Sequence, residues 1–199
     1  MIENKKQFWE YVYEDFRACG VVDGIYVGDV RSKLSLCRYA FGLNKLHYQF
    51  LLRYSEYITN CCKLRFYGKM VRWHCRNLGT KLGFHIPFNI CGKGLNLAHE
   101  GTVIISWEAK IGEYCRIHAG VNIGVNGDIP GAPVIGNGVY IGPGAKIFGP
   151  IEIADFVAIG ANAVVNESIA VSNLTVAGIP AKVISNKGSR KLLYYPNEM

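Results

Sequence analysis

The fold of this chain is decided by residues 105–171, which read ISWEAKIGEYCRIHAGVNIGVNGDIPGAPVIGNGVYIGPGAKIFGPIEIADFVAIGANAVVNESIAV. Every sixth residue from the first is Ile or Val: Ile105, Ile111, Ile117, Ile123, Ile129, Ile135, Ile141, Ile147, Ile153, Ile159, Val165 and Val171. A period of six fits neither an α-helix, which repeats every ~3.6 residues, nor an isolated strand, which repeats every ~2. It is the hexapeptide signature of a parallel β-helix, in which each aliphatic side chain points into a prism and stacks on its copies.

The repeat also predicts where the prism is interrupted and where it ends. A second, smaller apolar row follows four residues behind the first, as crowded inner corners require: Val139, Ala145, Ile151, Val157, Ala163 and Ile169. Between Gly124 and Val134 the segment VNGDIPGAP contains two Gly and two Pro, which exclude a regular strand. We predict a protruding loop there, with Ile129 in phase only by chance. The β-helix is predicted over residues 83–185, and a loosely held C-terminal tail over residues 186–199.

Length, composition and cysteine usage restrict the class of protein. The chain has 199 residues, half of them apolar, which predicts one domain with an appendage and excludes a disordered chain. The opening MIENKKQFWEYVYEDF carries acids inside its apolar pattern, so no signal peptide is expected. Seven Cys without a CxxC pair predict neither a zinc site nor a disulfide scaffold. We therefore expect a cytoplasmic protein that holds no metal.

Residues 1–82 are predicted to form an α-helical segment, rich in aromatic residues, that caps the open end of the prism or packs against a neighbouring chain. Apolar side chains recur there at helical spacing in three stretches, and a fourth stretch is ambiguous. The helices are expected over residues 3–18, 45–59 and 63–78, and the ambiguous short helix lies near residues 31–41.

The net charge of +7 is concentrated in the same part of the chain. Residues 45–93 hold nine Lys or Arg and a single acid, Glu56. Four of the cations form a stripe on the third predicted helix: Arg65, Lys69, Arg72 and Arg76. One interpretation is a solvated helix face; another is attraction of an anionic acceptor or a peripheral contact with a membrane surface. Nucleic acid is not expected as a partner, because no recognition motif accompanies the charge.

Two of the five histidines are candidates for chemistry. His99 takes the place of an inward aliphatic six residues before Ile105, but an imidazole fits an apolar interior poorly, so the coil there should be offset with the ring outside. His118 follows Ile117, where the repeat usually has Gly, and should also point outward. Histidine suits general base work because its unperturbed pKa is about 6.5. A base beside an alcohol and an activated acyl donor gives O-acyl transfer; the alternative for both histidines is a structural role.

Several motifs resemble one family: LAHEGTVIIS, RIHAGVNIG, IGPGAKIFGPIEI, AIGANAVV and VAGIPAKVI. Over residues 83–185 the chain resembles the hexapeptide-repeat acyltransferases, most closely the serine acetyltransferase group and related polysaccharide O-acetyltransferases. The resemblance implies a left-handed parallel β-helix, a homotrimer with active sites between subunits, and acetyl-CoA as the donor. It also implies that a histidine deprotonates the acceptor hydroxyl, which attacks the thioester while backbone N–H groups stabilise the oxyanion.

The resemblance assigns roles to individual residues. His99 matches the catalytic histidine and is the predicted general base, with His118 as a second candidate. The positions that match acetyl-CoA contacts are Gly124, Pro143, Ala161 and Lys182.

The candidate site departs from the serine pattern. The group has Asp immediately before its catalytic histidine, where this chain has Ala98, and an orienting Asp fifteen residues before it, where this chain has Phe84. The loop also lacks the Arg-His pair of the group. If Phe84 does not orient the His99 imidazole, a backbone carbonyl or Glu100 would have to.

These departures lead us to predict an O-acetyltransferase acting on a sugar or polysaccharide-precursor hydroxyl, with a small molecule or a glycan as acceptor. The first alternative is a serine O-acetyltransferase of cysteine biosynthesis. The second, of another class, is a non-catalytic trimeric β-helix platform.

Overall fold

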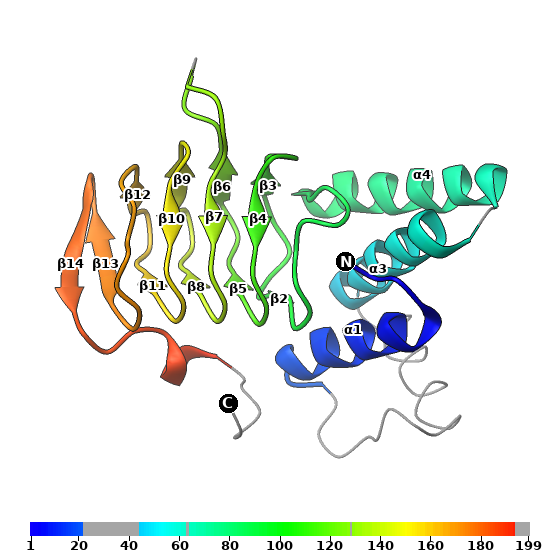
Figure 1. Cartoon of the computed structure of the whole chain (residues 1–199), viewed down its shortest axis with the longest axis horizontal. Coiled ribbons are helices and arrows are strands. Elements are labelled where there is room, and N and C mark those ends of the chain that lie inside the picture. The colour runs from blue at the N-terminus through cyan, green and yellow to red at the C-terminus, as the bar shows by residue number, and fades with distance from the viewer. Residues whose placement is uncertain (22–43, 63, 128, 194–199) are drawn as a thin grey trace.

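The computed structural model describes residues 1–21, 44–62, 64–127 and 129–193. Within these ranges three α-helices precede the strands, and they lie together at one end of the molecule, beside a stack of short strands (Figure 1). The helices are α1 (Lys5–Ala18), α3 (Asn44–Cys61) and α4 (Arg65–Leu82). They confirm the three predicted helices, whereas the ambiguous short helix near residues 31–41 lies outside the described residues.

Local chemistry explains where two of the helices begin and end. The side chain of Asn4 caps α1 by accepting a hydrogen bond of 2.9 Å from the backbone N–H of Gln7. Helix α4 continues past the predicted end, and Gly79 in its last turn lets it pack closely on α3: a Cβ there would lie 2.9 Å from the Tyr48 ring. It ends at Gly83, whose φ of +84° lies in the left-handed region that glycine adopts most readily.

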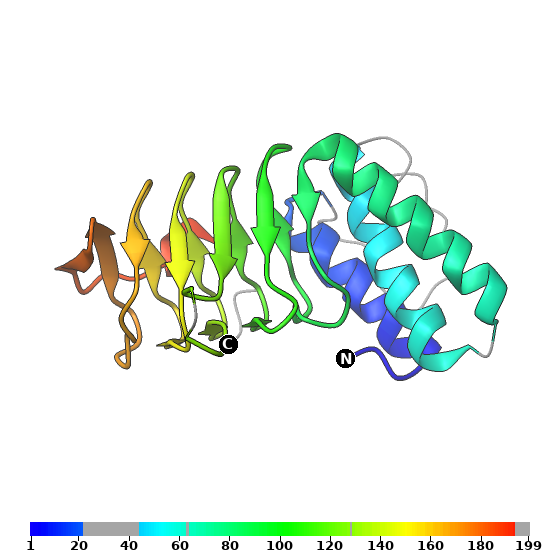
Figure 2. The ribbon, with the colours of Figure 1, turned by 90° about the horizontal axis from the view of Figure 1, so that it is seen from above.

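The strands after α4 are short and build three sheets. One sheet has the order β1-β3-β6-β9-β12, the second β4-β7-β10, and the third β2-β5-β8-β11-β13-β14. Every pairing is parallel except that of the last two strands. The strands are β1 (Phe84–His85), β2 (Asn96–Leu97), β3 (Val103–Ile105), β4 (Lys110–Ile111), β5 (Arg116–Ile117), β6 (Val121–Gly124), β7 (Val134–Ile135), β8 (Tyr140–Ile141), β9 (Lys146–Phe148), β10 (Glu152–Ile153), β11 (Ala158–Ile159), β12 (Val164–Val165), β13 (Thr175–Gly178) and β14 (Ala181–Ser185). Successive coils therefore stack side by side, as Figure 2 shows from above.

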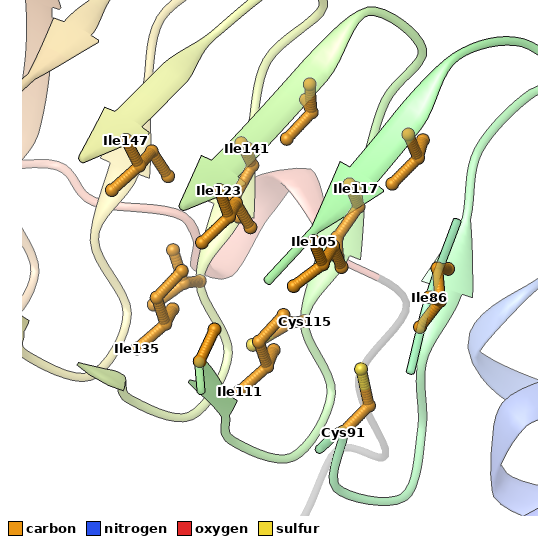
Figure 3. Close-up of a cluster of buried hydrophobic side chains, with 14 of the residues drawn as sticks. Ile86, Cys91, Ile105, Ile111, Cys115, Ile117, Ile123, Ile135, Ile141 and Ile147 are labelled. Atoms are coloured by element: carbon orange, nitrogen blue, oxygen red, sulfur yellow. The ribbon is translucent and has the colours of Figure 1, made fainter. Parts of the chain in front are cut away.

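The hexapeptide row forms the core of this stack. The Ile side chains of neighbouring coils lie against one another between the sheets (Figure 3). From Ile105 to Val165 each member of the row is at most 4% exposed, apart from Ile129, which is 50% exposed. Ile129 lies on the loop between β6 and β7, which projects from the stack in Figure 1 and confirms the predicted interruption.

The predicted end of the row is wrong by one repeat. Val171 is 61% exposed rather than buried. Ile169 instead forms a parallel bridge with Ile153, sixteen residues earlier, whereas Ile159 pairs with Ile141 eighteen residues earlier. The last coil is therefore two residues shorter than the regular coils, so the inward position moves from Val171 to Ile169.

A buried ionic network joins the helices to the first coil. The guanidinium of Arg53 on α3 donates to both carboxylate oxygens of Asp15 on α1, at 2.8 and 3.2 Å, and to Glu56 at 3.1 Å. It also donates to the backbone carbonyls of Cys91 and Gly92, at 2.9 and 2.5 Å. These hydrogen bonds connect α1 and α3 to the first coil. The division into domains at residue 83 stays a prediction.

The segment after β14 is partly anchored in the described range. Ser189 is fully buried and its hydroxyl donates to the backbone carbonyl of Gly138. The guanidinium of Arg190 lies 3.7 Å from the centroid of the Phe156 ring. The expectation of a loosely held tail is therefore wrong for this part, because these contacts hold it against the coils. Within the described ranges, no helix is long and apolar enough to cross a membrane.

Candidate active site

His99 lies on the turn that follows β2, and all three helices hold this turn. Lys45 of α3 donates a hydrogen bond of 3.0 Å to the carbonyl of Ala98, directly before His99. Asn96 donates to the carbonyl of Ala18 at the end of α1, at 2.6 Å. The N–H of Gly101 donates to Leu82 at the end of α4, at 3.0 Å. The backbone of the turn is therefore fixed on both sides of the histidine.

The coil is offset at this turn, as predicted. Leu97 is fully buried and pairs with Ile117, whereas His99 is exposed. The aliphatic position of the first coil is therefore taken by Leu97, two residues earlier than the strict period, and the imidazole of His99 remains outside the core.

His118 lies beside His99, although the two residues come from different coils. Their ring centroids are 5.8 Å apart, and the ring of Tyr140 lies 5.1 Å from His118 on the other side. Burial lowers the pKa of His118, and the positive charges of Arg116 and His99 lower it further. The imidazole of His118 is therefore neutral at pH 7, and its buried Nε2 has no hydrogen-bond partner among the described residues.

The two histidines lie on one edge of the stack, at the turns that lead from the β5-β8-β11 sheet into the β6-β9-β12 sheet. Residues 98–99, 118–119, 142–143 and 160–161 occupy equivalent places on successive coils. At each step the N–H of the first residue donates to a carbonyl of the next coil, at 2.8 to 3.1 Å. We call these four residue pairs the histidine corner.

The histidine corner also contains two of the four residues predicted to contact acetyl-CoA. Pro143 and Ala161 follow His99 along the same line of the corner, and both are exposed. Lys182 of β14 is exposed and pairs with Ala177, whose methyl group lies next to Gly160. The fourth residue, Gly124, is the last residue of β6, whereas the histidine corner lies where β6, β9 and β12 begin. The structure therefore separates Gly124 from the other three residues.

The positions that depart from the serine pattern are apolar and buried. Phe84 points into the core, where its ring centroid lies 5.0 Å from that of Tyr48. Ala98 is buried under the turn, and Glu100 is exposed. In the described part of the chain, no carboxylate or carbonyl oxygen accepts a hydrogen bond that would orient the imidazole of His99. Its ring contact within that part is with His118.

Sequence reasoning missed three residues of this site: Lys45, Arg116 and Tyr140. Arg116 and Tyr140 each precede a buried Ile of the row and pair with one another across β5 and β8. Aligning the coils with a six-residue insertion in the loop between Gly124 and Val134 would have paired Arg116 with Tyr140 beside His118. Lys45 comes from a helix and carries no periodic signal. In the described ranges, no group of three or more His, Cys, Asp or Glu side chains is arranged to hold a metal ion.

Comparison with known proteins gives the class to which this arrangement is similar. No family model matches the chain. Among curated proteins, it is 39% identical over 119 residues to a serine acetyltransferase of Synechococcus elongatus, a stretch that covers 59% of this chain and 48% of the relative. It is 38% identical over 100 residues to a serine acetyltransferase of Mycobacterium tuberculosis, covering 49% and 43% of the two chains. The chain thus spans less than half the length of either relative.

Solved structures give the same answer over a longer stretch. Serine acetyltransferase from Neisseria gonorrhoeae superposes with a TM-score of 0.67 and 25% identity, over 92% of this chain and 68% of that one. The coenzyme A complex of serine acetyltransferase from Brucella abortus superposes with a TM-score of 0.68 and 26% identity, over 93% and 70%. The resemblance inferred from the sequence motifs is therefore confirmed. The chain is similar to the hexapeptide-repeat acyltransferases and, among them, to the serine acetyltransferases.

Proposed function

We propose that this chain is an acetyl-CoA-dependent O-acetyltransferase that works at the histidine corner. The observation that carries the proposal is the placement of His99 and His118 on the same edge as Pro143 and Ala161. The similarity to serine acetyltransferases supports the same chemistry. It favours L-serine as the acceptor over the sugar hydroxyl that the departures at Phe84 and Ala98 led us to expect.

In this proposal His99 is the general base. Its exposed imidazole takes the proton of the acceptor hydroxyl, the step that a positioned histidine most often performs in general base catalysis. His118 stays neutral, so it places no second positive charge against the protonated His99. Acetyl-CoA supplies an activated thioester carbonyl when it is bound.

The exposed residues of the corner fit a long, anionic cosubstrate. Pro143 and Ala161 have short, apolar side chains that leave the edge of the coils accessible. Lys182 is an exposed cation that suits a phosphate group, and its present partner, Glu167, lies 3.5 Å away on the surface. Such an exposed ion pair is weak, so Lys182 exchanges Glu167 for a phosphate at little cost.

We also propose that the coils form a left-handed parallel β-helix and that three chains associate with active sites between them. The similarity to the solved serine acetyltransferases supports the fold. Gly124 lies at the opposite edge of the sheet from Pro143 and Ala161, so it would reach the same acetyl-CoA only from a second copy of the chain.

The acceptor has two candidates, each with a specific observation in its favour. The comparisons support L-serine. A sugar or polysaccharide-precursor hydroxyl is the second candidate, because the positions of the two aspartates are occupied by Phe84 and Ala98, which are buried and apolar. An acceptor without an amino group has no positive charge for the two carboxylates to bind.

The experiment measures CoA release with L-serine and with a panel of sugars, and CoA binding by calorimetry. We expect turnover with L-serine, and a loss of roughly 10²–10⁴-fold in kcat for His99→Ala with CoA binding retained. His85→Ala is the matched control, because His85 is an exposed histidine on β1 outside the corner.

Three outcomes would contradict parts of this proposal. Turnover with a sugar but not with L-serine would reverse the choice of acceptor. Full activity of His99→Ala together with inactive His118→Ala would transfer the role of base to His118. A chain that binds no CoA would favour the non-catalytic platform.

A further inference from the structure

Helix α4 has two apolar faces, of which one has no partner among the described residues. Val71 and Cys75 pack inward against α3 and the first coil. Phe66, Met70 and Trp73 point the other way and are 78%, 53% and 67% exposed. They follow one another at intervals of four and three residues, so they form a continuous apolar stripe on the outside of the helix.

Cations border this apolar stripe. Lys69 and Arg76 lie on one flank, and Lys81 with the imidazole of His74 on the other, as their positions on the helical wheel require. All three cations are exposed. The whole helix contains five Lys or Arg and no acid; these residues are Arg65, Lys69, Arg72, Arg76 and Lys81.

The helix lies where it can touch a flat surface. Figures 1 and 2 show α4 along the outside of the helical end, with α3 on its inner side. The outer face is shallowly hollowed by a pocket lined by Phe66, Lys69, Met70, Trp73 and His74. Contiguous exposed apolar patches bordered by polar residues mark interaction sites rather than ordinary protein surface.

We propose that this face of α4 binds the surface of an anionic lipid bilayer, with Phe66, Met70 and Trp73 inserted at the level of the headgroups. Aromatic and apolar residues on one stripe with Lys and Arg beside it are the composition of helices that lie in a membrane interface. The proposal concerns the outer face of α4 and does not depend on acyl transfer.

The charge of the helix argues against other partners. A second copy that docked with this same face would bring a helix with five cations and no acid against its own copy, which like charges oppose. A contact of this face with a different face of another copy, as a trimer would make, is the alternative that the sedimentation-velocity measurement below tests. A nucleic acid backbone would satisfy the cations but would leave Phe66, Met70 and Trp73 without an apolar partner. An anionic bilayer satisfies both the cations and the apolar stripe.

The experiment is co-sedimentation of the full chain with two kinds of vesicle, one of pure phosphatidylcholine and one of equal parts phosphatidylcholine and phosphatidylglycerol. We expect binding to the second kind only. The triple variant Lys69→Gln, Arg76→Gln, Lys81→Gln should bind at least tenfold more weakly, since each cation near an anionic surface contributes roughly fivefold. Its control, Lys5→Gln, Lys6→Gln, Lys187→Gln, removes the same charge from exposed positions outside α4.

A second pair of variants tests the apolar stripe. The triple variant Phe66→Ser, Met70→Ser, Trp73→Ser should also lose at least about tenfold in vesicle binding, because it removes the groups that insert. The control is Val183→Ser, Ile184→Ser on β14, where the two side chains are 55% and 65% exposed at the other end of the molecule. Circular dichroism of each variant verifies that α4 still folds.

The proposal is overturned if the chain does not bind anionic vesicles, or if both α4 variants bind them as well as their controls do. It is also overturned if sedimentation velocity shows that the Ser variant splits an assembly while vesicle binding is unchanged. The face would then be an interface between copies of this chain.

Discussion

Replacing the buried Arg53 by Met should loosen the helices from the first coil. Arg53 is fully buried and makes five hydrogen bonds, three to the carboxylates of Asp15 and Glu56 and two to the carbonyls of Cys91 and Gly92. Removing one partner of a buried ionic network costs about 3–5 kcal/mol, because the other charges lose their compensation. For a chain of this length that corresponds to a fall in Tm of roughly 6–20 °C.

The pH dependence of this loss sharpens the prediction. Burial raises the pKa of Asp15 to about 6, even though the neighbouring Arg53 charge pulls it down. Without Arg53 that pKa must rise further, so the folded variant keeps Asp15 protonated at a pH where the unfolded chain, with a pKa near 3.8, has lost the proton. Unfolding is then favoured progressively as the pH rises. The difference in stability between wild type and Arg53→Met should therefore be smallest below about pH 6 and grow above it.

The assay is chemical denaturation followed by circular dichroism at a series of pH values. Lys5→Met, at the exposed start of α1, is the control and should change stability by about 0.5 kcal/mol or less. Arg53→Lys keeps a positive charge but not the planar fork that reaches several acceptors, so it should lie between wild type and Arg53→Met. A loss of less than about 1 kcal/mol for Arg53→Met, or one that shrinks as pH rises, would refute the assigned role of the network.

Three further substitutions test the coils and the histidine corner. A Cβ at position 142 would lie 2.8 Å from the backbone N of Ala161, so Gly142→Ala should lower the free energy of unfolding by about 1–3 kcal/mol, measured by denaturation. Ile141→Ala should cost about 2–5 kcal/mol because it leaves a cavity in the core, whereas Ile104→Ala, at a position 41% exposed, should cost far less; equal losses would contradict the inward row. Since the pKa of His118 is lowered in the folded chain, the unfolded chain takes up its proton first as pH falls through about 6.5, and Tm should decrease there. His118→Phe should show a flatter Tm profile below that pH, and an unchanged profile would contradict the shift.

Much of the fold could be predicted because it rests on local patterns. The period of six predicted the buried row, and the Gly and Pro of residues 125–134 predicted the loop on which Ile129 lies exposed. Helical spacing predicted α1, α3 and α4. The error at Val171 arose where the last coil is two residues short, a change in length that the Ile and Val pattern does not reveal.

The candidate site was only partly predictable. His99 and His118 were identified singly, each as an outward-pointing histidine at an irregular place in the repeat. Their meeting with Tyr140 depends on which coils lie side by side, and therefore on the length of every coil between them. The apolar stripe of α4 was missed because the aromatic residues of the segment were expected to cap the prism or to pack against a neighbouring chain, and only the cations were assigned to the outer side of this helix.

The amino-acid sequence by itself determined most of the residues that point inward, since side-chain direction within one coil or helix follows from a short local period. It also determined the sign of the charge on α4. Only the tertiary structure decided which inward and outward residues of different coils meet, because stacking is a contact between segments some eighteen or more residues apart. It also decided that Arg53 joins Asp15 to the first coil, and that Phe66, Met70 and Trp73 face away from it. A local period in the sequence specifies the direction in which a side chain points. A functional site also requires that side chains from different coils lie next to one another, and this depends on the fold of the whole chain.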